Sequence, residues 1–152
     1  MNGKYTLKFT AMDDLPSYMD LVRLVRDNFP GLDTEEEMEK HRQYVIKCIA
    51  RGSAICVTQG QTVVGVLVFS PRQNCLSCLA VHPDHRRQGI ASALVEKVLS
   101  LLDPGRDVWV STFREEDDKG TAPRALYRKY GFAGGELTTE FGYPHQKFIL
   151  YR

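Results

Sequence analysis

The chain has 152 residues, a length that fits one domain, residues 1–152, built around a single hydrophobic core. It has 43% hydrophobic residues, 26% charged residues and a formal net charge of +1, which is ordinary for a soluble domain and gives no support for nucleic acid or a membrane as its partner. The longest apolar runs are too short to span a bilayer and the first residues hold no signal-peptide core, so we expect a cytoplasmic protein.

Residues 4–51 carry the signals of one strand followed by two helices. The alternation from Lys4 to Phe9 predicts a half-buried strand with Tyr5, Leu7 and Phe9 on one face. Asp13 or Asp14 can cap a first helix that ends at Pro30-Gly31, and its apolar stripe is formed by Leu15, Met19, Val22, Val25 and Phe29. Thr34 and Glu37 form a capping-box pattern, which predicts a second helix that closes at Arg51-Gly52.

Residues 54–151 switch to strands and two further helices. Turn signals divide the next apolar segments into predicted strands over 54–58, 63–70 and 75–81. A helix over 89–102, a strand over 107–112, a short helix over 122–130 and a strand pair within 137–151 complete the chain. Hairpins followed by a strand–helix–strand unit predict a mixed α/β fold of the α+β type, in which helices cover a sheet and the strands 75–81 and 107–112 run parallel.

The four cysteines are Cys48, Cys56, Cys75 and Cys78. The pair Cys75 and Cys78 has the spacing of a zinc or redox motif, but a zinc site usually needs a second close pair and the chain has none. A redox pair typically opens a helix, whereas this pair lies in a predicted strand, where its side chains would point to opposite faces. We therefore interpret all four cysteines as structural thiols in a reducing compartment and expect no metal.

The run from Val81 to Ala91 joins a predicted strand to a predicted helix and is rich in groups that bind anions. The first turn of a helix has unpaired N–H groups and a partial positive charge. Gly89 lets the backbone approach a bulky anion, and Arg86 and Arg87 add charge and forked donors. Such a corner suits a pyrophosphate, although a solvated basic turn would have the same residues. The run lacks the Gly-Lys-Ser/Thr of a Walker loop and two glycines of a dinucleotide fingerprint.

Two motifs occur together in the second half of the chain. The first reads Arg or Gln, two residues, Gly, one residue, then Gly or Ala, and it is filled by Arg86, Gly89 and Ala91. The second is a Leu-Tyr-x-x-x-Gly-Phe run from Leu126 to Phe132. Together they resemble the signatures of the GNAT superfamily of N-acetyltransferases, whose element order is similar over nearly the whole chain. The resemblance implies a central mixed, largely antiparallel sheet of about seven strands flanked by about four helices.

The same resemblance implies that the chain binds acetyl-CoA. The strand 75–81 would pair with the pantetheine arm in a gap beside the strand 107–112, and a backbone N–H near Cys78 or Leu79 would polarise the thioester carbonyl. The cofactor-binding residues so implied are Leu79, Ala80, Val81, Arg86, Arg87, Gln88, Gly89, Ile90, Ala91 and Ser92. Many members of the family also carry an Asn shortly before the Leu-Tyr pair, and here only Lys119 or Thr121 could replace it.

The resemblance also suggests which residues move protons. Tyr127 matches the family tyrosine that acts as general acid, although it could instead only pack against the cofactor arm. Family bases vary in position, and the candidates are Glu35, Glu36, Glu37, Glu39, Glu140 and His145, of which we select Glu37 and His145. The acidic run from Asp33 to Glu39 also fits the start of a helix, where carboxylates interact favourably with the helix dipole. His145 also fits an ordinary surface position.

The leading hypothesis is direct transfer of an acetyl group from acetyl-CoA to a primary amine in a ternary complex. The acidic run and the single-domain size favour a small cationic acceptor. A non-catalytic CoA-binding or sensing module, a protein N-acetyltransferase and transfer of a longer acyl chain are the alternatives. The resemblance also suggests a homodimer, because many members of the family are dimers, but the residues themselves give no signal for one.

Overall fold

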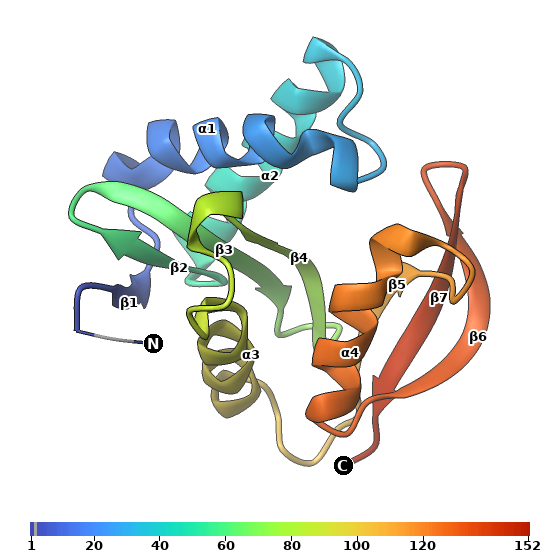
Figure 1. Cartoon of the computed structure of the whole chain (residues 1–152). Coiled ribbons are helices and arrows are strands. Elements are labelled where there is room, and N and C mark those ends of the chain that lie inside the picture. The colour runs from blue at the N-terminus through green and yellow to red at the C-terminus, as the bar shows by residue number, and fades with distance from the viewer. Residues whose placement is uncertain (2) are drawn as a thin grey trace.

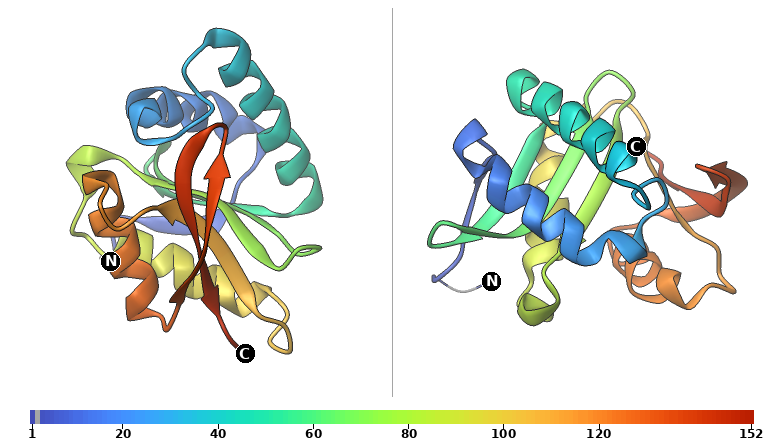
Figure 2. Two further views of the ribbon diagram at one scale, coloured as in Figure 1. Left: turned by 90° about the vertical axis from the view of Figure 1, so that its right-hand side faces the viewer. Right: turned by 90° about the horizontal axis from the view of Figure 1, so that it is seen from above.

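The seven strands form one sheet with two helices on each face (Figures 1 and 2). The structure is a computed structural model that describes residue 1 and residues 3–152, so Asn2 of the range 1–152 lies outside the described residues. The strands are β1 (Thr6–Phe9), β2 (Ala54–Gln59), β3 (Thr62–Ser70), β4 (Cys75–Val81), β5 (Val108–Phe113), β6 (Ala133–Glu140) and β7 (Tyr143–Leu150). The helices are α1 (Leu15–Val25), α2 (Glu35–Arg51), α3 (Ile90–Leu101) and α4 (Thr121–Lys129).

The strand order in the sheet is β1-β2-β3-β4-β5-β7-β6. Every neighbouring pair is antiparallel except β4 and β5, which run parallel and are joined through α3. This arrangement confirms the predicted mixed, largely antiparallel sheet and the parallel relation of the strands 75–81 and 107–112. Among the described residues, no helix is both long enough and apolar enough to cross a membrane.

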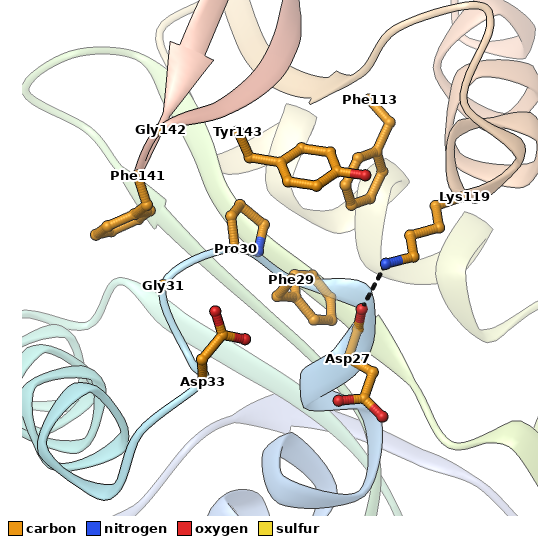
Figure 3. Close-up of a pocket in the computed structure, with 10 residues that line it drawn as sticks. All are labelled: Asp27, Phe29, Pro30, Gly31, Asp33, Phe113, Lys119, Phe141, Gly142 and Tyr143. Carbon is orange, nitrogen blue, oxygen red and sulfur yellow. Dashed lines mark hydrogen bonds between the residues drawn. The ribbon is translucent and has the colours of Figure 1, made fainter.

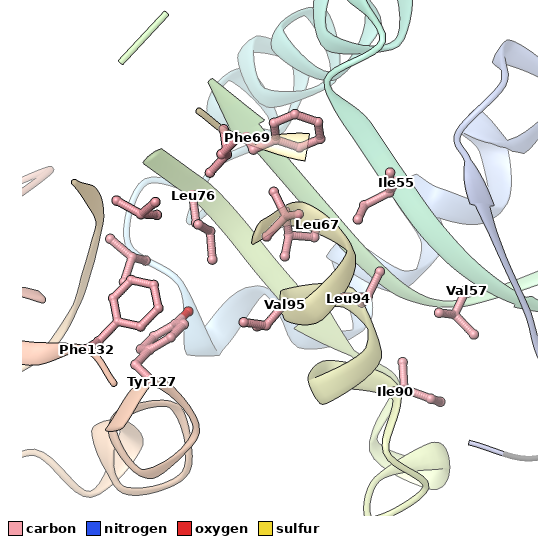
Figure 4. Packing of buried hydrophobic residues seen from close by; sticks show 14 of the residues in the cluster. Ile55, Val57, Leu67, Phe69, Leu76, Ile90, Leu94, Val95, Tyr127 and Phe132 are labelled. Carbon is pink, nitrogen blue, oxygen red and sulfur yellow. The ribbon is translucent and has the colours of Figure 1, made fainter. Parts of the chain in front are cut away.

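Each face of the sheet has its own hydrophobic cluster. On one face, α1 and α2 bury side chains such as Tyr18 and Val45 against β3. On the other face, α3 and α4 pack Leu94 and Tyr127 into a cluster that Figure 4 shows. Gly65 of β3 allows the close approach of α3, because a Cβ at this position would lie 2.5 Å from the Ile90 side chain. The start of α3 is thereby held directly over the sheet.

The N-terminal elements depart from the prediction at two phenylalanines. Phe9 was expected on the buried face of the first strand, but its side chain is 50% exposed, because β1 is an edge strand. Phe29 was expected on the stripe of the first helix, but α1 ends at Val25 and a short 3-10 turn follows, Arg26–Asn28. Phe29 then lies in extended backbone, partly buried beside the α1–α2 cluster.

A β-bulge at Ser77 changes the alternation within β4. Leu76 and Cys78 pair with neighbouring residues of β3, so Ser77 is the extra residue. Leu76 consequently packs on the α3 face and Cys78 on the α1–α2 face, although regular alternation would put them on one face. The prediction that Cys75 and Cys78 point to opposite faces assumed this regular alternation and is therefore not confirmed. All four cysteines are free thiols.

Candidate functional site

β4 and β5 begin side by side and then diverge. Their parallel pairing is limited to the first residues of the two strands, Cys75 with Trp109 and Leu76 with Val110. Further along, β4 pairs only with β3 and β5 pairs only with β7. The β5-facing edge of β4 from Ser77 onward therefore offers backbone groups without a strand partner, which an amide-bearing ligand can use as an added strand does.

The loop between β4 and α3 forms an anion-binding corner. Arg87 and Gly89 both have left-handed backbone, with φ of 61° and 78°, which turns successive N–H groups toward one side. No side chain caps the N-terminus of α3, so its first N–H groups are available to a ligand. The side chains of Arg86, Arg87 and Gln88 are exposed, whereas that of Ile90 is buried, so Ile90 can contribute only its backbone.

Two histidines, His82 and His85, support the backbone of this loop. His82 accepts a hydrogen bond from the Asp84 N–H at 3.1 Å, and the rings of His82 and His85 meet edge to face. The Tyr5 hydroxyl and His85 Nδ1 are 2.9 Å apart, which ties the loop to the segment before β1. Both histidines thus support the loop backbone, which leaves the arginines and the helix N-terminus for an anion.

The first turn of α3 also contacts the end of α4. Lys129 donates from Nζ to Ser92 Oγ at 3.2 Å, and the single proton of the Tyr130 hydroxyl is within reach of the Ser92 carbonyl at 3.3 Å and of Glu96 at 3.1 Å. The ammonium of Lys129 therefore lies near the uncapped end of α3. Sequence reasoning did not select Lys129 as a ligand, although it stands inside the Leu-Tyr-x-x-x-Gly-Phe run.

Tyr127 lies beneath the divergence of β4 and β5. Its buried ring packs against Phe132 and Phe148, and Figure 4 shows its hydroxyl end pointing away from α4. Burial, and then the charge of a Cys78 thiolate, raise the pKa of the Tyr127 hydroxyl well above its ordinary value. Burial also raises the pKa of the Cys78 thiol to about 12. Both groups therefore keep their protons at neutral pH.

Tyr44 of α2 approaches the same region from the opposite face. Its hydroxyl donates to Ser77 Oγ at 3.0 Å, which connects α2 to the bulge in β4. Burial raises the pKa of the Tyr44 hydroxyl, so it stays a donor at neutral pH. The bulge is therefore held from α2 at the point where β4 leaves β5.

His145 and Glu37 lie in different surroundings. His145 is 5% exposed, its ring centroid lies 4.9 Å from that of Phe113, and Nδ1 is 3.3 Å from the Tyr143 carbonyl. The Glu37 carboxylate instead completes the predicted capping box, because it accepts from the Thr34 N–H at 3.2 Å. The structure thus places His145 next to aromatic side chains of β5 and β7, and it places Glu37 at the start of α2.

The other carboxylate candidates in the acidic run also have structural partners. Glu35 forms a bidentate contact with Arg23 at 2.6 and 3.0 Å, which lowers the pKa of the carboxyl group. Glu39 accepts from Gln43 at 2.9 Å. Glu36 lies 3.8 Å from Lys40. The run therefore stabilises the start of α2. Glu140 lies elsewhere, as the last residue of β6 before the turn of the β6–β7 hairpin.

A cavity of about 180 Å³ lies where three connecting segments meet (Figure 3). These segments are the α1–α2 connection, the β5–α4 connection and the tip of the β6–β7 hairpin. The cavity has aromatic walls and two carboxylates, and its lining residues are Asp27, Phe29, Pro30, Gly31, Asp33, Phe113, Lys119, Phe141, Gly142 and Tyr143. Because Phe113 and Tyr143 also touch His145, that histidine lies directly behind the cavity wall.

A mixed sheet whose parallel strands diverge beside an uncapped helix N-terminus is the arrangement that the resemblance to the GNAT superfamily implied. Residues 50–133, more than half of the chain, match the family described as "Acetyltransferase (GNAT) domain". The chain therefore belongs to the GNAT acetyltransferase family, as its two motifs predicted.

Relatives of known structure or curated function agree with this membership. A mycothiol acetyltransferase from Kocuria rhizophila is 30% identical over 106 residues, which are 66% of this chain and 34% of that protein, so the chain spans about a third of its length. A GNAT acetyltransferase from Bacillus cereus has a TM-score of 0.71 at 21% identity, with 97% of both chains covered. An N-acetyltransferase from Thermoplasma acidophilum in complex with coenzyme A has a TM-score of 0.69 at 14% identity, covering 97% and 98% of the chains. At such identities the structures show that the fold is shared.

Proposed function

We propose that the protein is an N-acetyltransferase that moves an acetyl group from acetyl-CoA directly to a primary amine of a small cationic acceptor. The observation that best supports this proposal is that three features surround one gap in the sheet: the anion-binding corner, the free edge of β4 and the buried hydroxyl of Tyr127. Structures that share the fold were solved with coenzyme A or acetyl-CoA. The four free thiols fit the reducing environment of the cytoplasm, where we expect the protein to act.

The residues around the gap fit acetyl-CoA. The left-handed backbone at Arg87 and Gly89 and the uncapped turn of α3 suit a pyrophosphate, with Arg86 and Lys129 as further cations. The free edge of β4 at Leu79, Ala80 and Val81 suits an arm that contains amides. When bound, the cofactor supplies the acetyl group as an activated thioester, which no side chain of this chain could provide.

In this proposal, the hydroxyl of Tyr127 acts on the leaving sulfur. Its pKa is raised, so the proton does not leave spontaneously, and transfer to a thiolate with an ordinary pKa of about 8.5 would be uphill. The hydroxyl therefore acts first as a hydrogen-bond donor toward charge that develops on sulfur. Complete transfer becomes favourable only where burial raises the basicity of the sulfur as well.

The acceptor binds, in this proposal, in the cavity between the α1–α2 connection and the β6–β7 hairpin. Aromatic rings, the carbonyl oxygen of Asp27 and the carboxylate of Asp33 suit an ammonium attached to a short apolar segment. His145 lies behind the wall of this cavity, whereas the Glu37 carboxylate already caps α2. We therefore favour His145 over Glu37 as the group that receives a proton from the acceptor.

The proposal is tested by mixing the protein with acetyl-CoA and a panel of amines while the release of free thiol is followed. Polyamines, amino acids and peptides with free amino groups cover both small-molecule and protein acceptors. Amine-dependent thiol release is the expected result, with small cationic amines as the better acceptors. Tight CoA binding without turnover of any amine would favour the non-catalytic sensing module instead, and an absence of CoA binding would reject both.

A further inference from the structure

Two adjoining hollows share the side chains of Lys119 and Tyr143. The inner hollow is the cavity of about 180 Å³ described above. The outer hollow measures about 640 Å³ and is lined by Arg114, Glu116, Asp117, Asp118, Lys119, Tyr143 and Pro144. Lys119 therefore stands on the boundary between a small inner cavity and a wider outer one.

The ammonium of Lys119 already makes the contacts that a bound amine would need. Its Nζ donates to the carbonyl oxygen of Asp27 at 3.0 Å, and Figure 3 shows this bond between two residues that line the cavity. The same Nζ lies 5.9 Å from the centroid of the Tyr143 ring, within the range of cation–π attraction. A carbonyl acceptor and an aromatic face together recognise a primary ammonium, and here they are occupied by one that belongs to the protein.

Asp117 fixes the position of Lys119 relative to the ring of Tyr143. Its Oδ1 accepts from the backbone N–H of Lys119 at 3.0 Å, and its Oδ2 accepts from the Tyr143 hydroxyl at 2.7 Å. One carboxylate thus fixes both the start of the lysine side chain and the tilt of the ring. The contact of Lys119 with Asp27 then joins the β5–α4 connection to the 3-10 turn that follows α1.

The charges around the two hollows favour a cation. Five carboxylates line them, against the two cationic side chains of Lys119 and Arg114. The Arg114 guanidinium is directed at the carbonyl oxygens of Thr138 and His145, at 2.9 Å each. Lys119 is therefore the cation whose charge faces the path between the hollows, and its removal leaves an acidic passage.

We propose that the exposed side chain of Lys119 occupies the ammonium position of the acceptor cavity, and that the primary ammonium of the acceptor enters through the outer hollow and displaces it. This inference rests on the proposed transfer to an amine. When Lys119 moves away, the boundary that it forms between the two hollows opens, and they join into one passage. The acceptor takes over the Asp27 carbonyl and the Tyr143 ring, which defines the acceptor as a primary alkylammonium. The Lys119 ammonium lowers the apparent affinity for the acceptor, because only molecules in which it has moved away can bind.

The test compares Lys119→Met, which keeps length and removes charge, with Lys119→Arg, which keeps the charge. The dissociation constant of n-butylamine is measured by ligand-observed NMR in the presence of CoA, together with the KM values for n-butylamine and for acetyl-CoA. In Lys119→Met we expect amine binding to tighten about two- to tenfold, with an unchanged KM for acetyl-CoA. In Lys119→Arg we expect values near those of the unaltered protein.

Unchanged or weaker binding of n-butylamine to Lys119→Met overturns the inference. A raised KM for acetyl-CoA in the same variant also overturns it, because Lys119 would then hold the cofactor in place of the family Asn. Melting temperature and CoA affinity of each variant show that the fold and the donor site are intact. A protein that releases no thiol with any amine disproves the proposed function, whereas the butylamine titration decides the role of Lys119 without any turnover.

Discussion

The proposed donor side and the proposed acceptor side of the gap are built in different ways. The donor side is one continuous stretch from β4 to the first turn of α3, and it offers mostly backbone groups. The acceptor side is assembled from three connecting segments far apart in the sequence, which meet through side chains such as Lys119 and Phe141. Backbone recognition tolerates sequence change, whereas a few substitutions in loops can alter an acceptor site. Variants on the two sides should therefore affect different kinetic constants.

The largest effect is expected at Tyr127, the proposed proton donor to the leaving sulfur. Tyr127→Phe keeps the buried ring and removes the hydroxyl, so kcat for amine acetylation should fall about 100-fold while both KM values stay similar. Because burial raises the pKa of this hydroxyl, its proton is retained as the pH rises, and kcat of the unaltered protein should show no loss of an acid between about pH 7 and pH 9. Steady-state thiol release measures both.

The matched control is Tyr151→Phe, which removes a hydroxyl from an exposed tyrosine near the C-terminus. It should leave kcat unchanged. If Tyr127→Phe also kept full kcat, the residue would serve only to pack against the cofactor arm. Melting curves of both variants separate a chemical loss from a loss of fold.

A second, smaller effect concerns the donor side alone. Replacing Arg86 and Arg87 together by Ala removes two exposed cations from the anion-binding corner, so the KM for acetyl-CoA should rise about tenfold. The KM for the amine should not change. With acetyl-pantetheine, which carries no phosphate, the variant and the unaltered protein should have equal KM values. Arg72→Ala, which removes one exposed cation from the turn before β4, is the control and should have no effect.

A rise in the KM for acetyl-pantetheine would show that the arginines support the loop rather than bind phosphate. The salt dependence gives a further check, because added salt should weaken acetyl-CoA binding to the unaltered protein more than to the double variant.

The contrast between a site built from one continuous stretch and a site built from distant segments also explains which features could be predicted from the sequence. The capping box of Thr34 and Glu37 and the start of α3 at Gly89 were predictable, because they depend on residues close together in the chain. The bulge at Ser77 was not, because it depends on how β4 pairs with β3. The cavity could not be foreseen either, since Gly31 and Phe141 meet across 110 positions only in the folded chain.

A third prediction tests the acceptor side at Gly31. A Cβ there would lie 2.7 to 2.9 Å from the ring of Phe141, and the φ of 82° disfavours any residue with a side chain. Gly31→Ala should therefore displace the hairpin tip, change the KM for amines about two- to fivefold and leave the KM for acetyl-CoA unaltered. The melting temperature should fall by a few degrees.

The double variant Gly31→Ala with Phe141→Ala separates the two causes. Removing the ring relieves the steric overlap but not the backbone strain, so part of the loss in melting temperature should remain. An altered KM for acetyl-CoA in either variant would show that the hairpin tip also shapes the donor side.

The smallest effect is expected at the bond between Asp117 and Tyr143, which aligns the outer hollow. Hydrogen bonding to Tyr143 lowers the pKa of the Asp117 carboxyl, and the same bond raises the pKa of the Tyr143 hydroxyl. A lowered carboxyl pKa stabilises the fold above the ordinary aspartate value of about 3.9, and this stabilisation is lost as the pH falls through the lowered value. A raised hydroxyl pKa stabilises the fold below the ordinary tyrosine value of about 10, and this stabilisation is lost as the pH rises through the raised value.

Tyr143→Phe should therefore melt about one degree lower than the unaltered protein at neutral pH, because an exposed bond contributes little. The difference should shrink as the pH falls through the lowered pKa of the Asp117 carboxyl, because protonation removes the charge that strengthens the bond. Thermal melts of the two proteins across this pH range measure it. A difference that persisted in acid would assign the effect to ring packing against Phe113, whose centroid lies 5.5 Å from that of Tyr143, and not to the hydrogen bond. Either way the KM for acetyl-CoA should stay constant, because the bond belongs to the acceptor side alone.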